Sequence, residues 1–122
     1  LALELPRIDK RRTGRAYRYC YAVEQPSLDE MRGIVRLDVL TGEVMRHAVP
    51  PGDQNSEPVF VPLAGSSEDD DGWVLACVYR AATDTSDVVV LDARRLDAEP
   101  VATVHLPVRI PAGFHGAWLP RD

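Results

Sequence analysis

The sequence lacks any long apolar run. The stretch from Val74 to Tyr79 is typical of its longest, far short of the roughly 20 residues that a membrane-spanning helix needs. It also lacks the motifs G-x-S-x-G, G-x-G-x-x-G, the P-loop and H-E-x-x-H, which are signatures of α/β-hydrolases, dinucleotide binding, nucleotide triphosphatases and zinc proteases. Ten prolines and eight glycines scattered through 122 residues argue against long helices. We therefore expect an all-β chain about the size of one domain.

A strong charge of one sign is also missing. The net charge of −5, with 27% charged and 45% hydrophobic residues, is ordinary for a globular protein and gives no reason to expect a nucleic-acid partner. The apolar start, Leu1 to Pro6, is too short for a signal peptide. Because the chain does not begin with Met, we expect it to be a piece of a longer protein. Its association with membranes is left open.

Cysteine is scarce as well. Cys20 and Cys77 lie far apart, each within a strand-like run, and have no C-x-x-C spacing. We interpret them as two free, mostly buried thiols of an intracellular protein, which we expect in the cytoplasm. A single disulfide between them stays open at this point.

What the sequence does contain is a series of short alternating runs. These predict strands separated by turns, and one helical turn from Ser27 to Met31 with Ser27 as its N-cap. The expected strands cover residues 18–23, 34–39, 44–49, 73–79, 88–91 and 101–106, with a hairpin turn at 41–42 and a second turn at 83–86.

A faint internal repeat runs through these strands. Residues 34–38 and 88–92 each end in Leu-Asp and are followed by a turn, an acidic residue and a returning strand. Leu37 and Leu91 are 54 positions apart, near the roughly 40 to 50 residues of a four-stranded propeller blade with an inserted loop. Two blades cannot close a ring, which again indicates a fragment.

Two charge clusters invite a functional interpretation. Six basic residues between Arg7 and Arg18 could bind an anion or a nucleic acid, but a solvated loop is favoured because no aromatic platform accompanies them. The run from Glu68 to Gly72 resembles part of a calcium loop. Aligned on Gly72, however, that loop would begin at Ser67 and end at Val78, where Asp and Glu are needed, so a polar turn is expected instead.

Among three histidines, His115 has the setting closest to that of a metal ligand. It follows Gly113 and Phe114 and precedes Gly116, and flanking glycines allow unusual backbone angles and leave room beside the imidazole. His47 and His105 lie in strand patterns without a nearby carboxylate in the sequence and are expected to be structural or exposed.

Glu57 is the second residue of interest, because it stands just ahead of the apolar run Pro58 to Pro62. An exposed loop glutamate is the interpretation that sequence physics favours, since a buried carboxylate is costly unless paired. The functional alternative makes Glu57 the acceptor that orients a ligand imidazole. One histidine and one glutamate do not complete a transition-metal site, so further ligands would have to lie outside this chain.

Several motifs, in order, resemble the carotenoid cleavage oxygenases. They lie at residues 5–19, 57–62, 68–73, 83–94 and 104–116 and cover nearly the whole chain, in a pattern similar to the last quarter or so of a family member. The resemblance implies the C-terminal blades of a seven-bladed β-propeller, forming part of one domain. It also implies a non-haem Fe(II) held by four histidines, with glutamates orienting three of them.

On this resemblance His115 is the last iron ligand and Glu57 one of the orienting glutamates. No such role carries over to His47 or His105. The implied activity is that of a dioxygenase, which cleaves a conjugated double bond of an apolar carotenoid, apocarotenoid or stilbene with O₂ to give two carbonyl products. The chain alone is expected to be inactive and to fold poorly, because exposed blade edges invite aggregation.

Other interpretations remain open beside this one. A non-catalytic propeller piece that serves for binding or as a scaffold is the main alternative, and zinc or copper could replace iron on imidazole ligands. Phe60 and Phe114 are candidates to line the apolar site or to pack in a core. Ala112 stands where the family often has a bulkier residue and could widen a nearby pocket. Cys20 and Ser56 stand where Gly is common.

Overall fold

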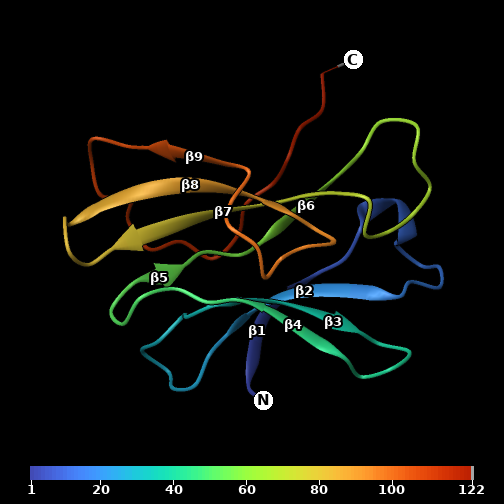
Figure 1. The fold of residues 1–122 in the computed structure, drawn as a ribbon, viewed down its shortest axis with the longest axis horizontal. Coiled ribbons are helices and arrows are strands. Elements are labelled where there is room, and N and C mark those ends of the chain that lie inside the picture. The colour runs from blue at the N-terminus through green and yellow to red at the C-terminus, as the bar shows by residue number, and fades with distance from the viewer. Residues whose placement is uncertain (122) are drawn as a thin grey trace.

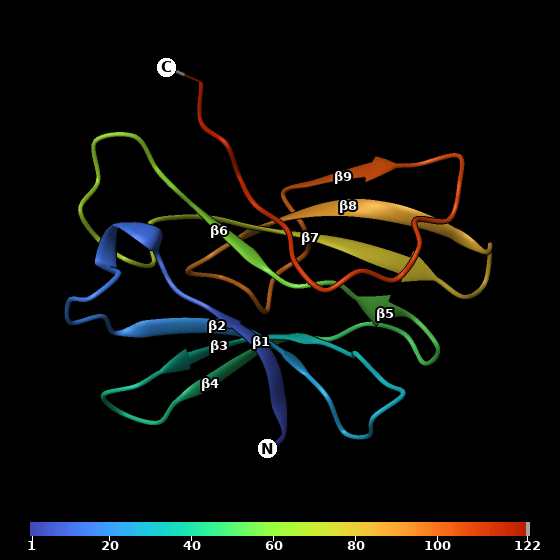
Figure 2. The same cartoon turned by 180° about the vertical axis from the view of Figure 1, so that it is seen from behind.

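The structure is a computed structural model that describes residues 1–121. It contains two antiparallel sheets and one short 3-10 helix, η1 (Lys10–Arg12). Figures 1 and 2 show the two sheets lying one over the other, with the first sheet near the N-terminus and the second carrying the C-terminal segment. The first sheet comprises β1 (Leu3–Arg7), β2 (Tyr19–Glu24), β3 (Ile34–Asp38) and β4 (Val44–His47), and the second comprises β5 (Gln54–Asn55), β6 (Val59–Pro62), β7 (Gly72–Arg80), β8 (Thr85–Asp92) and β9 (Ala102–His105).

Each sheet is a meander. The order is β1-β2-β3-β4 in the first sheet and β5-β7-β8-β9 in the second, where β6 also pairs with β7. The repeat in the sequence corresponds to equivalent strands, since β3 and β8 each stand third in their sheets. The aspartates that end them close similar turns: Asp38 Oδ1 accepts from the Leu40 amide at 3.0 Å, and Asp92 Oδ1 from the Arg94 amide at 2.9 Å. The expected all-β fold is confirmed, and the sheets have the four-stranded form of propeller blades.

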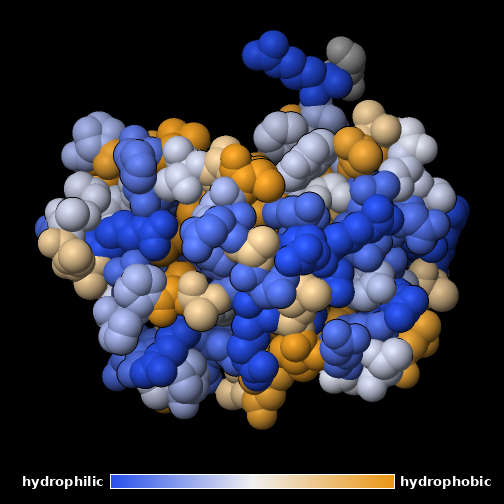
Figure 3. All heavy atoms as spheres, viewed as in Figure 1, coloured by the Kyte–Doolittle hydropathy of each residue, from blue (hydrophilic) through white to orange (hydrophobic). Residues whose placement is uncertain are grey.

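The core lies between the sheets. Tyr21 of β2 and Phe60 of β6 stack with ring centroids 5.4 Å apart and an interplanar angle of 7°. Valine and leucine side chains of β7 and β8 complete the same cluster. Core packing is therefore what Phe60 does here, whereas Phe114 is exposed. Large apolar side chains are otherwise scattered over a mainly hydrophilic surface, as on the face in Figure 3.

Two bulges interrupt the strands that begin the two sheets. In β1, Glu4 pairs with Val23 and Arg7 with Tyr21, so one extra residue stands on the β1 side. Leu5 in this bulge has φ 53°, a left-handed conformation that costs a bulky residue about 1–3 kcal/mol. Bulges re-aim the side chains that follow them.

The second bulge separates β5 from β6. Asn55 lies opposite Val78 and Val59 opposite Leu75, so this edge again carries one extra residue relative to β7. The Ser56 side chain bridges the break by accepting from the Cys77 amide at 2.9 Å. Glu57 stands in this interruption.

Three sequence predictions were wrong in detail. Residues 27–31 form a turn with an isolated bridge between Ser27 and Glu30, not a helical turn, because the chain must reverse to pair β2 with β3. The turn expected at 83–86 ends at Asp84, and Thr85 already belongs to β8. Three segments that the pattern did not predict are β1, η1 and the two-residue β5.

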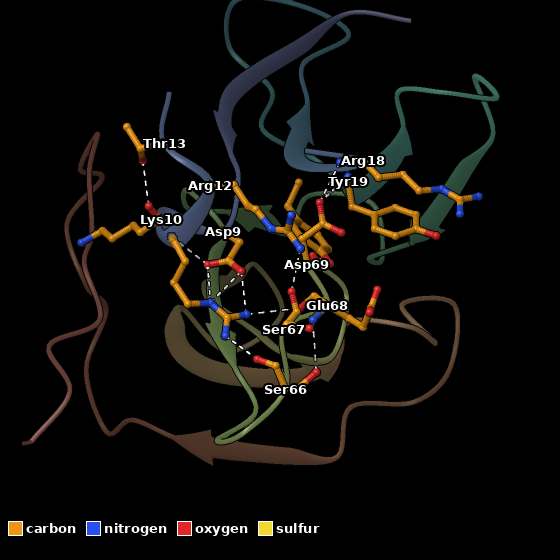
Figure 4. Close-up of polar contacts among 12 residues, drawn as sticks. Asp9, Lys10, Arg12, Thr13, Arg18, Tyr19, Ser66, Ser67, Glu68 and Asp69 are labelled. Carbon is orange, nitrogen blue, oxygen red and sulfur yellow. Dashed lines mark hydrogen bonds and ion pairs between the residues drawn. The ribbon is translucent and has the colours of Figure 1, made fainter. Parts of the chain in front are cut away.

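The basic N-terminal stretch is not simply a solvated loop. Figure 4 shows its residues facing the loop that contains Ser66 to Asp69, where Arg12 donates to the Ser67 carbonyl at 2.6 Å and the Arg18 amide donates to Asp69 Oδ2 at 2.7 Å. Asp69 is buried, so the acidic run is more than a polar turn. Of the six basic residues, Lys10 and Arg15 remain exposed as expected.

The cysteines are free thiols in the structure, which answers the question left open by the sequence. Both are half-buried, and burial raises the pKa of each thiol above its ordinary value. Across residues 1–121 there is no helix with the length and apolarity that crossing a bilayer requires.

Replacing Gly72 by Ala is expected to destabilise the full-length protein by about 2–3 kcal/mol. A Cβ at Gly72 would stand 2.1 Å from the Val61 carbonyl oxygen, which belongs to the paired backbone of β6 and cannot move aside freely. Thermal unfolding measures the effect. Gly113→Ala is the matched control, because a Cβ there meets nothing within 4 Å. Equal melting temperatures for the two variants would contradict this account of β6–β7 packing.

Candidate metal-binding site

The Glu57 carboxylate is buried, with the residue only 5% exposed, so the favoured sequence interpretation of an exposed loop glutamate is wrong. Its two oxygens are fully engaged. Oε2 accepts from Arg7 Nη1 at 2.6 Å and from the Gly116 amide at 2.9 Å, and Oε1 lies 3.2 Å from His115 Nδ1. The cost of burial is thus offset by pairing with a cation and two further donors.

These partners keep Glu57 ionised. Burial by itself would raise the pKa of Glu57, but the hydrogen bonds from the Gly116 amide and from His115, together with the charge of Arg7, hold it below its ordinary value. An ionised carboxylate can only accept hydrogen bonds. His115 Nδ1 therefore carries the proton in this contact, and Nε2 of the neutral ring keeps its lone pair.

His115 is carried by the C-terminal segment, which runs back over the second sheet after β9 (Figure 2). This segment is fastened to Ser86, whose Oγ accepts from the Ile110 amide at 2.9 Å, and then to Glu57 through Gly116. The imidazole side chain is 77% exposed, so Glu57 orients the ring from one side and leaves the rest of it free.

The flanking glycines act differently from expectation. The φ of neither Gly113 nor Gly116 lies in the left-handed region. A Cβ on Gly116 would make only an ordinary contact, 3.7 Å from a Val59 methyl group. The room beside His115 is therefore present, but unusual backbone angles are not what the glycines provide.

Arg7 is the residue of this cluster whose part sequence reasoning missed. Its Nη1 donates both to Glu57 Oε2 and, at 3.0 Å, to the Gly116 carbonyl. Arg7 and Glu57 are 50 positions apart and lie in different sheets, so no local pattern relates them. The signal in the sequence was only that Arg7 belongs to the first motif of the family resemblance.

The other two histidines lie elsewhere. His47 of β4 is half-buried, and burial lowers its pKa below the ordinary value. His105 of β9 is exposed, as expected, but the fold gives it a carboxylate partner, since its Nδ1 lies 2.8 Å from Asp87 Oδ1. Ala112, named in the sequence as a residue that could widen a pocket, lines a cavity of about 140 Å³ with Asn55, Cys77 and Ile110.

Asp87 gives the fold an acid-sensitive contact. Burial would raise its pKa, but hydrogen bonds from Arg80 at 2.7 Å and from His105 hold it below the ordinary value. Its contribution to stability is complete above about pH 4, the range of an unfolded aspartate, and is lost as the pH falls through the lowered folded pKa. We expect Asp87→Asn to lower the melting temperature at pH 7 and to approach wild type at acid pH. Exposed Asp29→Asn is the control, and a gap independent of pH would contradict this assignment.

No group of three or more metal-ligating side chains occurs within residues 1–121. The donor set does fit one position of an imidazole-bound metal, because His115 has Nδ1 held by a carboxylate and Nε2 free. Further ligands must come from outside the described residues.

The comparisons with known proteins cover this arrangement along its length. The family model described as RPE65, retinal pigment epithelial membrane protein, matches residues 1–120. A carotenoid 9,10(9',10')-cleavage dioxygenase 1 of Pisum sativum is 36% identical over 98% of this chain and 25% of its own length. A lignostilbene-alpha,beta-dioxygenase isozyme III of Sphingomonas paucimobilis is 34% identical over 94% of this chain and 26% of its own.

Solved structures agree. A cobalt-substituted form of the Synechocystis apocarotenoid oxygenase superposes with a TM-score of 0.90 at 32% identity, over 96% of this chain and 25% of that one. The chain thus spans about a quarter of the length of the curated relatives it matches. Its two sheets are blades of a β-propeller, and the chain belongs to the family of RPE65 and the carotenoid cleavage dioxygenases.

Proposed function

We propose that this chain is the C-terminal part of a longer propeller domain and that the whole protein is a non-haem Fe(II) dioxygenase. Its reaction would be the O₂-dependent cleavage of a conjugated carbon–carbon double bond to two carbonyl products. The substrate class is an apolar carotenoid, apocarotenoid or stilbene, as the names of its relatives suggest. The observation that carries the proposal is the Glu57–His115 pair within a chain that matches the family model almost throughout.

In this proposal His115 Nε2 is one of four imidazole ligands, and the other three lie outside this chain. Bound ferrous iron would supply the activation of O₂. Glu57 holds the Nδ1 proton and so fixes both the tautomer and the direction in which Nε2 points. The chain alone would be inactive, because one imidazole cannot retain the metal.

The test uses the full-length protein, purified anaerobically and loaded with Fe(II). Incubation with an apocarotenoid and, separately, with a lignostilbene under ¹⁸O₂ should give two carbonyl fragments, detected by mass spectrometry, with label from O₂. An iron-loaded protein that binds these substrates but cleaves neither would favour the non-catalytic scaffold. Metal analysis of the protein as isolated separates iron from zinc or copper.

A further inference from the structure

We propose that Arg7 is a positioning residue for the metal centre, acting on His115 through Glu57 and through the backbone at Gly116. The inference rests on the function proposed above. It concerns a residue of a different sheet from Glu57 and 109 positions before Gly116.

The contacts form a closed ring. Arg7 Nη1 donates to Glu57 Oε2 at 2.6 Å and to the Gly116 carbonyl at 3.0 Å, while the Gly116 amide donates to the same Oε2 at 2.9 Å. With Oε2 held by two donors, the carboxylate cannot rotate without losing both. Oε1 is thereby left facing His115 Nδ1, which is the contact that sets the ligand tautomer.

Arg7 also fixes the segment that carries the ligand. Gly116 directly follows His115, and Arg7 grips its carbonyl while Glu57 holds its amide. Both peptide groups on the C-terminal side of the histidine are therefore tied to one carboxylate–guanidinium unit. The unit joins the first sheet, the break between β5 and β6, and the C-terminal segment.

The backbone is built to deliver Arg7 to this place. The β1 bulge puts Leu5 at φ 53° and is followed by Pro6, which has no amide hydrogen to contribute to the sheet. A left-handed leucine is kept only where the surrounding structure holds it. The Arg7 side chain is 20% exposed and its partner carboxylate 4%, so the pair is largely withdrawn from solvent.

A second ion pair supplies a matched control. Arg18 of the same N-terminal stretch binds the buried carboxylate of Asp38 at 2.7 Å, with no contact to the His115 cluster among its hydrogen bonds. Removing either guanidinium leaves a buried carboxylate without its cation. Only the loss of Arg7 should reach the metal.

The experiment compares Arg7→Met and Arg18→Met in the full-length protein with Co²⁺ as the probe, since a family member has been solved in a cobalt-substituted form. We expect both variants to lower the melting temperature. Arg7→Met alone should weaken Co²⁺ binding by about tenfold to a hundredfold in a chelator competition, and should shift the visible Co²⁺ absorption bands. Arg7→Lys, which keeps a cation within reach of Glu57, should recover part of the affinity.

Co²⁺ affinity and absorption bands in Arg7→Met that match those of Arg18→Met would overturn the inference and leave Arg7 a structural residue. If Arg7→Met does not accumulate as folded protein, the same comparison with Arg7→Lys decides, since an unchanged spectrum and affinity there again assign Arg7 no effect on the metal. A wild-type protein that binds no metal at these ligands would instead overturn the proposed function, and with it this inference. Intact metal binding and cleavage activity beside an unaffected Arg7→Met overturns the inference alone.

Discussion

Replacing His115 by Ala in the full-length protein is expected to abolish stoichiometric iron binding and with it the cleavage of the conjugated substrate. The loss of metal affinity should exceed the tenfold to hundredfold effect of removing an orienting partner, because the ligand atom itself is lost. Stability should change little, since the imidazole side chain is 77% exposed and supports no core contact. Iron analysis after anaerobic purification, with activity measured on the same samples, checks both results.

His105→Ala is a closely matched control. Its imidazole is 81% exposed, and its Nδ1 lies 2.8 Å from the buried carboxylate of Asp87, so the local chemistry resembles that of His115 and Glu57. The difference is location, at the β9 edge rather than beside the C-terminal segment. If His115→Ala retained iron as His105→Ala should, His115 would be a structural histidine and the scaffold interpretation would take precedence.

The sheets could be predicted from the sequence because strand alternation and turn residues are local signals. The runs that became β2, β3, β4, β7 and β9 were placed within a few residues, and the Leu-Asp repeat identified equivalent strands. What local patterns could not predict was the first strand of each sheet. Both contain bulges, whose extra residues at Leu5 and Ser56 to Pro58 break the two-residue period that marks a strand.

The site was predictable only in part for a related reason. His115 and Glu57 were singled out through a family resemblance, whereas the physics of the sequence alone favoured an exposed Glu57. That judgement failed because the groups that stabilise the buried carboxylate are 50 and 59 positions away, at Arg7 and Gly116. The energetic cost of a buried charge depends on partners that only the tertiary structure brings together.

Replacing Glu57 by Gln is expected to weaken metal binding by about tenfold to a hundredfold, although the change is nearly isosteric. The carboxylate accepts at both oxygens, from Arg7 and the Gly116 amide on one side and from His115 on the other. An amide has only one acceptor oxygen, and its NH₂ group must face donors whichever way it is turned. Either the ring of His115 loses its acceptor, or Arg7 and Gly116 lose theirs.

The same conflict lowers stability, by about 2–3 kcal/mol, because it leaves a largely buried guanidinium without its counter-ion. Glu43→Gln is the control, since Glu43 is exposed on the β3–β4 hairpin and should leave metal affinity and melting temperature unchanged. A chelator competition and a thermal unfolding curve on the full-length protein measure the two effects separately. A Glu57→Gln variant with lowered stability but wild-type metal affinity would mean that the carboxylate serves the blade interface rather than the imidazole. Loss of affinity at unchanged stability would mean that Arg7 finds another partner and that orienting His115 is the main work of Glu57.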